Sequence, residues 1–165
     1  TGHYKVAVNY AASILASEEA EKRGYDQTLW LDAQENKYME EVGSMNIFFV
    51  ISGVVVTPML AGSILPGITR KSTIELLKAR GYTVEERRVS VDEVVKAAED
   101  GTLNEIFGTG TAAVVSPVGS FGYNGKDYTV GDGQMGKITK YVYDELTGIQ
   151  TGVKPDEFGW VERIV

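Results

Sequence analysis

Two short apolar runs on either side of a two-residue turn constrain this chain more than any other feature. Residues 47–51 (IFFVI) and 54–57 (VVVT) are rich in β-branched and aromatic side chains, and Ser52 and Gly53 separate them. This pattern predicts two strands that pair as a β-hairpin, with Phe48 and Phe49 in the core. The turn also keeps the apolar stretch shorter than the roughly 18 residues that a membrane span requires. The chain is therefore expected to contain a sheet and no membrane span.

The rest of the chain is predicted to be a mixture of helices and further strands. Helices are expected over residues 10–23, 69–80, 91–99 and 136–147, and further strands over 28–31, 37–41, 82–89, 105–107 and 113–118. Asn124 and Gly125 predict a hairpin turn between short strands at 121–123 and 128–130. Ser90 and Glu93 have the spacing of a capping box at a helix start. Because helices and strands do not alternate strictly, we expect one α+β domain, or a loosely α/β one.

Composition excludes several classes of function. The chain has 165 residues, which suffices for one domain, and a net charge of -7 argues against nucleic acid and anionic membranes as partners. It contains no cysteine, so it has no disulfide and no cysteine nucleophile, and this composition fits a reducing cytoplasm. His3 is the only histidine, so we expect no histidine metal cluster and no Ser-His-Asp triad.

A few positions suggest chemistry on physical grounds alone. Gly67 precedes the helix expected at 69–80, and free backbone N–H groups at a helix start form an anion site. Glu40 and Glu41 are adjacent carboxylates, and spacing alone does not choose between them. The segment 107–113 (FGTGTAA) is only a weak dinucleotide fingerprint, because a strand rather than a helix is expected to follow it.

Four segments in a fixed order carry a family resemblance. They are residues 5–13 (KVAVNYAAS), 40–48 (EEVGSMNIF), 65–70 (LPGITR) and 107–113 (FGTGTAA). Together they resemble the branched-chain amino acid aminotransferases, which are class IV, fold type IV enzymes that depend on pyridoxal 5'-phosphate (PLP). The resemblance extends between the segments and reaches Trp160. It implies the large domain of the D-amino acid aminotransferase-like fold.

The resemblance also implies a role for individual residues. Lys5 would bind PLP covalently and then act as the general base and acid, Tyr10 would reach the phenolic oxygen of PLP, and Glu41 would face the pyridine nitrogen. The backbone of Ile68 and Thr69 and the hydroxyl of Thr111 would hold the phosphate, and Ser44 and the Ala112 N–H would hold the substrate carboxylate. The implied reaction moves an amino group between leucine, isoleucine or valine and 2-oxoglutarate, with 2-oxo acids and glutamate as the other participants.

The resemblance places a smaller N-terminal domain before the lysine, whereas Lys5 is nearly the first residue here. We therefore expect residues 1–165 to correspond to the C-terminal PLP-binding domain, with the N-terminal small domain absent, of a homodimeric cytoplasmic parent enzyme. Ala7 and Val8 replace a glycine-containing pair, so we expect a reshaped loop after Lys5. Two alternatives stay open, namely a non-catalytic fragment that folds without turnover and a D-amino acid aminotransferase domain. The sequence EVGSMN at 41–46 favours the branched-chain class over the latter.

Overall fold

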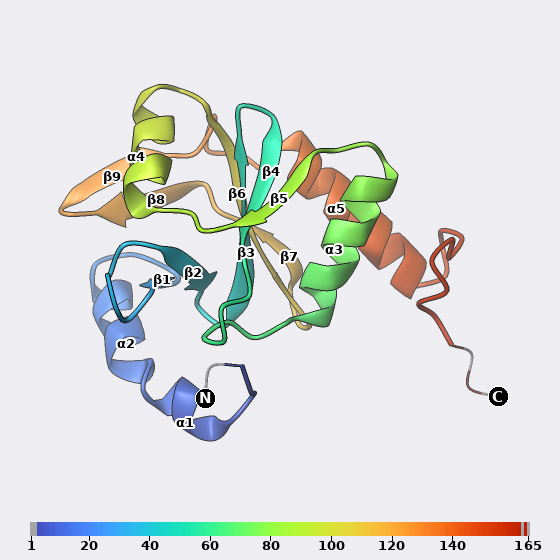
Figure 1. Cartoon of the computed structure of the whole chain (residues 1–165), viewed down its shortest axis with the longest axis horizontal. Coiled ribbons are helices and arrows are strands. Elements are labelled where there is room, and N and C mark those ends of the chain that lie inside the picture. Colours follow the sequence, from blue (N-terminus) through green and yellow to red (C-terminus); the bar gives the residue numbers. More distant parts are fainter. Residues whose placement is uncertain (1–2, 163, 165) are drawn as a thin grey trace.

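A computed structural model describes residues 3–162 and residue 164. Its centre is a seven-stranded sheet built around β3 (Met45–Ile51), as Figure 1 shows. One edge of β3 pairs along its length with β6 (Leu103–Gly110), which in turn pairs with β7 (Val114–Pro117). The other edge is shared, because β2 (Met39–Val42) pairs with the start of β3 and β4 (Val54–Pro58) pairs with its end. The two strands therefore occupy successive parts of the same edge of β3.

The outer strands complete the sheet. β1 (Leu29–Leu31) pairs antiparallel with β2, and β5 (Val84–Arg87) pairs parallel with β4. The parallel pair is joined by α3 (Ile68–Ala79), which makes the one crossover of the β-α-β type among the described elements. All other strand pairs of the sheet are antiparallel, so the α+β expectation is confirmed.

Helices and a second hairpin cover the two faces of the sheet. α3 and α5 (Lys137–Gln150) lie on one face over Phe48, Val50 and Phe107, while α4 (Val91–Glu99) and the β8 (Ser120–Tyr123) and β9 (Lys126–Thr129) hairpin lie on the other over Phe49 and Ile106 (Figure 1). Since successive side chains of a strand point to opposite faces, a sheet covered on both sides needs apolar residues at consecutive positions. This is why the run at 47–51 is apolar without alternation.

Both predicted hairpin turns are confirmed, and their backbone explains their residues. Ser52 and Gly53 have φ values of 51° and 79°, and Asn124 and Gly125 have 50° and 76°. Positive φ at both central residues is the type I′ geometry that matches the twist of two paired strands. The Ser90 cap also forms, with its hydroxyl accepting from the Glu93 N–H at 3.1 Å.

Three predicted boundaries are wrong. The helix expected at 10–23 is divided into α1 (Ala7–Ala11) and α2 (Ile14–Lys22), because both the N–H and the hydroxyl of Ser13 bond to the Tyr10 carbonyl and interrupt the regular ladder. β6 spans Leu103–Gly110 rather than the residues 105–107 that the sequence predicts. α5 extends to Gln150 rather than residue 147. Within the described part of the chain, no helix is long and apolar enough to cross a membrane.

Candidate active site

A cavity of about 460 Å³ lies between the N-terminal segment, the β1–β2 end of the sheet and the loop after β4. One wall comes from α1 and the residues before it, a second from β1, β2 and the turn after β2, and a third from the loop after β4. Three residues with expected roles line it together, namely Tyr10, Glu41 and Ser44. Tyr10 is far from the other two in sequence, so the fold brings the three together.

Glu41 has the most perturbed environment of the three. It lies on β2 beside the buried Val42, with its side chain in the cavity wall. Burial raises the pKa of Glu41 from 4.5 to about 7, and the nearby Glu40 charge adds to this rise, while a hydrogen bond from the Leu65 N–H opposes it. A carboxyl group that titrates near neutral pH can exchange a proton with a pyridine-type base, whose positive charge would in turn favour the carboxylate.

The structure distinguishes Glu40 from Glu41, which spacing alone could not do. The Glu40 carboxylate accepts a hydrogen bond from the Ser63 hydroxyl. Glu41 instead accepts from the side-chain amide of the buried Asn46 at 3.3 Å, and it has the strongly raised pKa. Both carboxylates line the cavity, and their hydrogen-bond partners and the raised Glu41 pKa distinguish them.

Lys5 and Tyr10, the two residues of segment 5–13 with expected roles, differ in whether they line the cavity. Tyr10 lies on α1 and lines the cavity, with 38% of its surface exposed. Lys5 precedes α1 and is exposed, and its neighbour Tyr4 rather than Lys5 itself lines the cavity. Val8 lies within α1, where φ is negative, so the β-branched side chain needs no glycine-like backbone. The valine at this position is thus accommodated by a helical turn.

The start of α3 carries Ile68 and Thr69 and has the properties of an anion site. Its N-cap is Gly67, no described side chain caps it, and its first turn contains no acidic residue. By contrast, Ser90 caps α4, and the Glu105 carboxylate accepts from the first N–H groups of α5. A long helix with an uncapped N-terminus presents free donors to a negatively charged group. Ile68 and Thr69 do not line the cavity, but Leu65, in the loop before α3, does.

The turn that carries Thr111 and Ala112 lies at the same end of the sheet. Thr109 on β6 pairs with Asn46 at the start of β3, and the turn between β6 and β7 follows directly. Thr111 and Ala112 are exposed and are not part of the cavity wall. The backbone beyond them is unusual, because Val114 has a φ of 56°. A β-branched residue in this region is a genuine outlier, of the kind that occurs next to functional turns.

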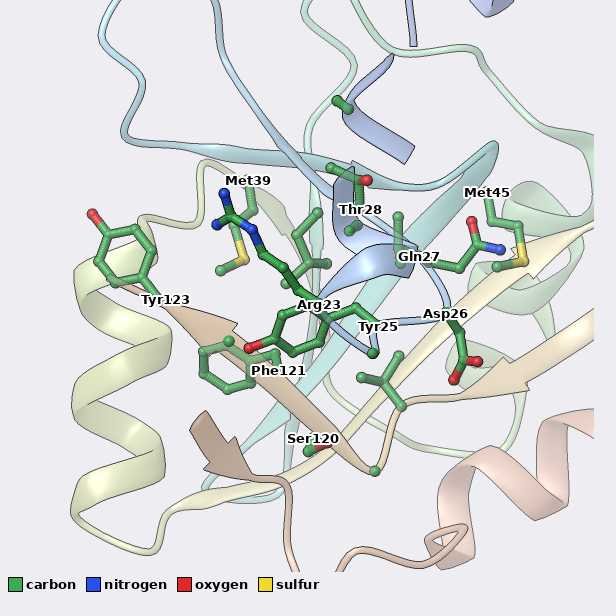
Figure 2. A pocket seen from close by; sticks show the side chains of 18 of the residues that line it. Arg23, Tyr25, Asp26, Gln27, Thr28, Met39, Met45, Ser120, Phe121 and Tyr123 are labelled. Atoms are coloured by element: carbon green, nitrogen blue, oxygen red, sulfur yellow. The ribbon is translucent and has the colours of Figure 1, made fainter. Parts of the chain in front are cut away.

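Figure 2 shows a larger cavity of about 570 Å³, which is lined by Leu29 of β1 and by Met39 and Val42 of β2. Met39, Met45 and Phe121 contribute its apolar wall, and Tyr25 at its edge donates a hydrogen bond to Asp127 at 2.5 Å. None of the eight residues with expected roles lines it. The smaller cavity is therefore the better candidate site, because it holds the shifted carboxyl group and the converging polar residues.

Sequence reasoning missed two features of the site. Asn46 belongs to the segment 40–48 but has no role predicted from the sequence. A single amide in an otherwise apolar strand is nevertheless a visible signal. The pairing of Ser63 with Glu40 had no signal, because the two residues are 23 positions apart.

Comparisons with known proteins agree with this geometry. A family model described as "Amino-transferase class IV" matches residues 1–121. The chain is similar to the "Probable branched-chain-amino-acid aminotransferase" of Staphylococcus epidermidis, with 59% identity over 159 residues that cover 96% of this chain and 44% of the relative. It is 55% identical to "Branched-chain-amino-acid aminotransferase 2" of Bacillus subtilis over 99% of this chain and 45% of the relative.

Solved structures give the same result. The branched-chain amino acid aminotransferase from Escherichia coli superposes with a TM-score of 0.82 at 34% identity, over 99% of this chain and 51% of that one. A second branched-chain amino acid aminotransferase, complexed with N-(5'-phosphopyridoxyl)-L-glutamate, gives a TM-score of 0.82 at 34% identity, over 98% of this chain and 50% of that one. The chain thus spans about half the length of the proteins it matches.

Proposed function

The chain belongs to the class IV aminotransferase family, and from this premise we propose that it is the cofactor-binding part of a PLP-dependent branched-chain amino acid aminotransferase. The observation that carries the proposal is the convergence of Tyr10, Glu41 and Ser44 on one cavity, with the pKa of Glu41 raised to about 7. When bound, PLP supplies an electron sink for the carbanion character that develops at the substrate α-carbon.

The chain's own residues have distinct tasks in this proposal. The Glu41 carboxylate would keep the pyridine nitrogen of the cofactor protonated, and the Tyr10 hydroxyl would orient its phenolic oxygen. The Lys5 amine would hold the cofactor, and as general base and acid it would move a proton at the substrate α-carbon.

The donors in the cavity wall, at the start of α3 and in the turn after β6 suit the anionic parts of cofactor and substrate. The N–H groups of Ile68 and Thr69 are uncapped by any described side chain, so they are available to a phosphate, to which Thr111 adds a hydroxyl. Ser44 and the Ala112 N–H are the proposed donors to the substrate carboxylate. This donor set fits a phosphorylated cofactor with an aromatic nitrogen.

The substrates follow from the relatives' names rather than from this chain. We propose leucine, isoleucine and valine as amino donors, in agreement with the names of the similar proteins, and 2-oxoglutarate as the acceptor that the family resemblance implies. We also propose that residues 1–165 act as the C-terminal PLP-binding domain of a cytoplasmic homodimer. Support comes from exposed apolar side chains on α1 and α2, since Val8, Ile14 and Leu15 are 57–68% exposed and would be expected to pack against further protein surface.

A second candidate is a fragment that folds but does not turn over. It is favoured by the weak attachment of the segment that contains Tyr10, because neither α1 nor α2 has a buried residue. We therefore expect the 165-residue chain to bind PLP without sustained transamination. Formation of glutamate from 2-oxoglutarate with L-leucine would exclude this candidate, and formation with D-leucine alone would favour a D-amino acid aminotransferase.

The proposal is tested by labelling. The purified chain is incubated with PLP, reduced with borohydride, digested, and mapped by mass spectrometry. We expect the phosphopyridoxyl label on Lys5, its loss in Lys5→Arg, and no change in Lys71→Arg, which replaces an exposed lysine on α3. Labels scattered over surface lysines, or an undiminished total label in Lys5→Arg, would contradict the assignment.

A further inference from the structure

Asn46 is a buried amide at the start of β3, with 5% of its surface exposed. Its side-chain nitrogen donates to the Leu65 carbonyl at 2.9 Å and to the Glu41 carboxylate at 3.3 Å. The Leu65 carbonyl is a pure acceptor, so the shorter of the two contacts determines the orientation of the amide. The reversed orientation would place the amide oxygen 2.9 Å from an oxygen that cannot donate.

The same three residues are linked a second time. The Leu65 N–H donates to Glu41, so Leu65 offers one backbone group to Glu41 and the other to Asn46. Two residues later, a β-carbon on Gly67 would collide with the Asn46 amide oxygen. Gly67 is the N-cap of α3. Asn46 therefore contacts both the carboxylate in the cavity and the loop that begins the anion-binding helix.

The amide bonds to Glu41 and Leu65 and leaves a neighbour in the sheet unsatisfied. Thr109 is paired with Asn46 across β3 and β6 and is 1% exposed, yet its hydroxyl has no hydrogen-bond partner among the described residues. A purely structural amide would be expected to satisfy this neighbour, because an unpaired buried hydroxyl is unfavourable. The hydrogens of Asn46 point instead to Glu41 and Leu65. A leucine of similar size would pack in this strand without introducing any polar group.

We propose that Asn46 is a positioning residue that holds the Glu41 carboxylate in the cofactor cavity and fixes its distance from the start of α3. This contact fixes the position of Glu41, the proposed partner of the ring nitrogen, relative to the N–H groups at the start of α3 that are proposed to bind the phosphate. The arrangement exists before the cofactor binds. The inference rests on the proposed function for its meaning, but the contact itself belongs to the free chain and is tested there.

The first experiment measures the titration of Glu41 in the chain without cofactor. The chain is labelled with [13C]glutamate at the carboxyl carbon, and the Glu41 signal is identified by its absence in Glu41→Gln. A hydrogen-bond donor favours the charged carboxylate, so Asn46→Leu is expected to raise the Glu41 midpoint by about one pH unit. Asn46→Asp keeps the shape and adds a charge, so a larger rise is expected.

A matched control removes an amide elsewhere. Asn104→Leu replaces an exposed asparagine of β6 whose side chain accepts from the Gly53 N–H, and it should leave the Glu41 midpoint unchanged. Thermal unfolding confirms that each variant is folded at the temperature of the titration. If Asn46→Leu does not fold, Asn46→Ala, which also removes the donor without adding a charge, provides the same comparison. A Glu41 midpoint that is the same in wild type and in the folded Asn46 variants would overturn the inference.

The second experiment connects the contact to cofactor binding. PLP affinity of the chain is measured by fluorescence for wild type, Asn46→Leu, Glu41→Gln and the double variant. We expect about a tenfold loss for Asn46→Leu alone and a much smaller further loss on the Glu41→Gln background, because the two residues act as one unit. Fully additive losses would overturn the inference. A wild-type chain without any PLP affinity would instead count against the proposed function, and the titration would still decide the role of Asn46.

Discussion

At the scale of single residues, Glu41 makes the stability of this chain depend on pH. Its pKa is raised from 4.5 to about 7, so the folded state holds a proton that the unfolded state releases. The stabilisation is complete below pH 4.5 and is lost as pH rises through about 7. Because the site is partly open to solvent, we expect a loss of about 1–2 kcal/mol rather than the full value of the shift.

This dependence can be measured by urea unfolding at pH 5 and pH 8. Glu41→Gln should lose less stability than wild type over this interval, since glutamine does not titrate. Glu18→Gln is the control, because Glu18 is an exposed residue of α2. Equal pH dependence in wild type and Glu41→Gln would show that burial does not raise this pKa in the folded chain.

A second prediction at this scale concerns the backbone of Val114. Its φ of 56° and the bond from the Val115 N–H to the Ala113 carbonyl at 2.6 Å form a tight turn that a β-branched residue adopts at a cost. Glycine adopts this conformation without strain, which offsets its lost packing and added unfolded-state entropy. We expect Val114→Gly to change the free energy of unfolding by less than about 1 kcal/mol.

The neighbouring residue gives the comparison. Val115 is 4% exposed and lies in β7 with ordinary backbone geometry, so Val115→Gly should cost at least about 2 kcal/mol. Chemical denaturation measures both variants. If the two substitutions cost the same, Val114 is not strained.

At the scale of elements, the helices differ in which groups accept hydrogen bonds from the N–H groups of their first turn. The Glu105 carboxylate accepts from the N–H groups of Ile138 and Thr139 at 3.0 and 2.8 Å and from the Thr139 hydroxyl at 2.6 Å, and it thereby ties α5 to β6. Gly136 leaves space for this carboxylate. The start of α3 has no such occupant among the described side chains, which is the contrast that supports a phosphate there.

The Glu105 contact predicts a specific loss of stability. Glu105→Gln keeps the size but turns one acceptor oxygen into a donor that faces an N–H group, so it should cost about 2 kcal/mol. Glu157→Gln, at an exposed residue that pairs with Arg80, should cost less than about 0.5 kcal/mol. Equilibrium unfolding in urea at neutral pH compares them. A loss in Glu105→Gln no larger than in the control would mean that α5 is held by packing alone.

At the scale of the whole molecule, the free energy of local opening is expected to differ between parts of the chain. β3 and β6 form the centre, with Phe48, Phe49 and Phe107 fully buried, whereas α1 and α2 contribute no buried residue. Regions with few buried contacts open at low free energy. Amide hydrogen exchange should therefore be fast over residues 7–22 and slowest over residues 45–51 and 103–110. Comparable protection of both regions would show that α1 and α2 are held more firmly than their burial indicates.

Interactions between residues close in sequence could be predicted from the sequence alone. The turns at 52–53 and 124–125 and the Ser90 cap depend on residues within three positions of one another, and each forms as expected. The error in the helix at 10–23 is also local, since it arises from a hydroxyl that competes for one carbonyl. Residue types and spacing along the chain also carried the family resemblance and the α+β class.

Interactions between distant residues were decided only by the tertiary structure. The sequence left Glu40 and Glu41 equivalent on spacing, and their contacts with Ser63 and Asn46 distinguish them. The cavity brings together α1, β1, β2 and the loop after β4, and no local pattern encodes this arrangement. Turn geometry and helix capping depend on residues that are neighbours in the sequence. Burial, pKa values and long-range hydrogen-bond partners depend on which distant segments pack together.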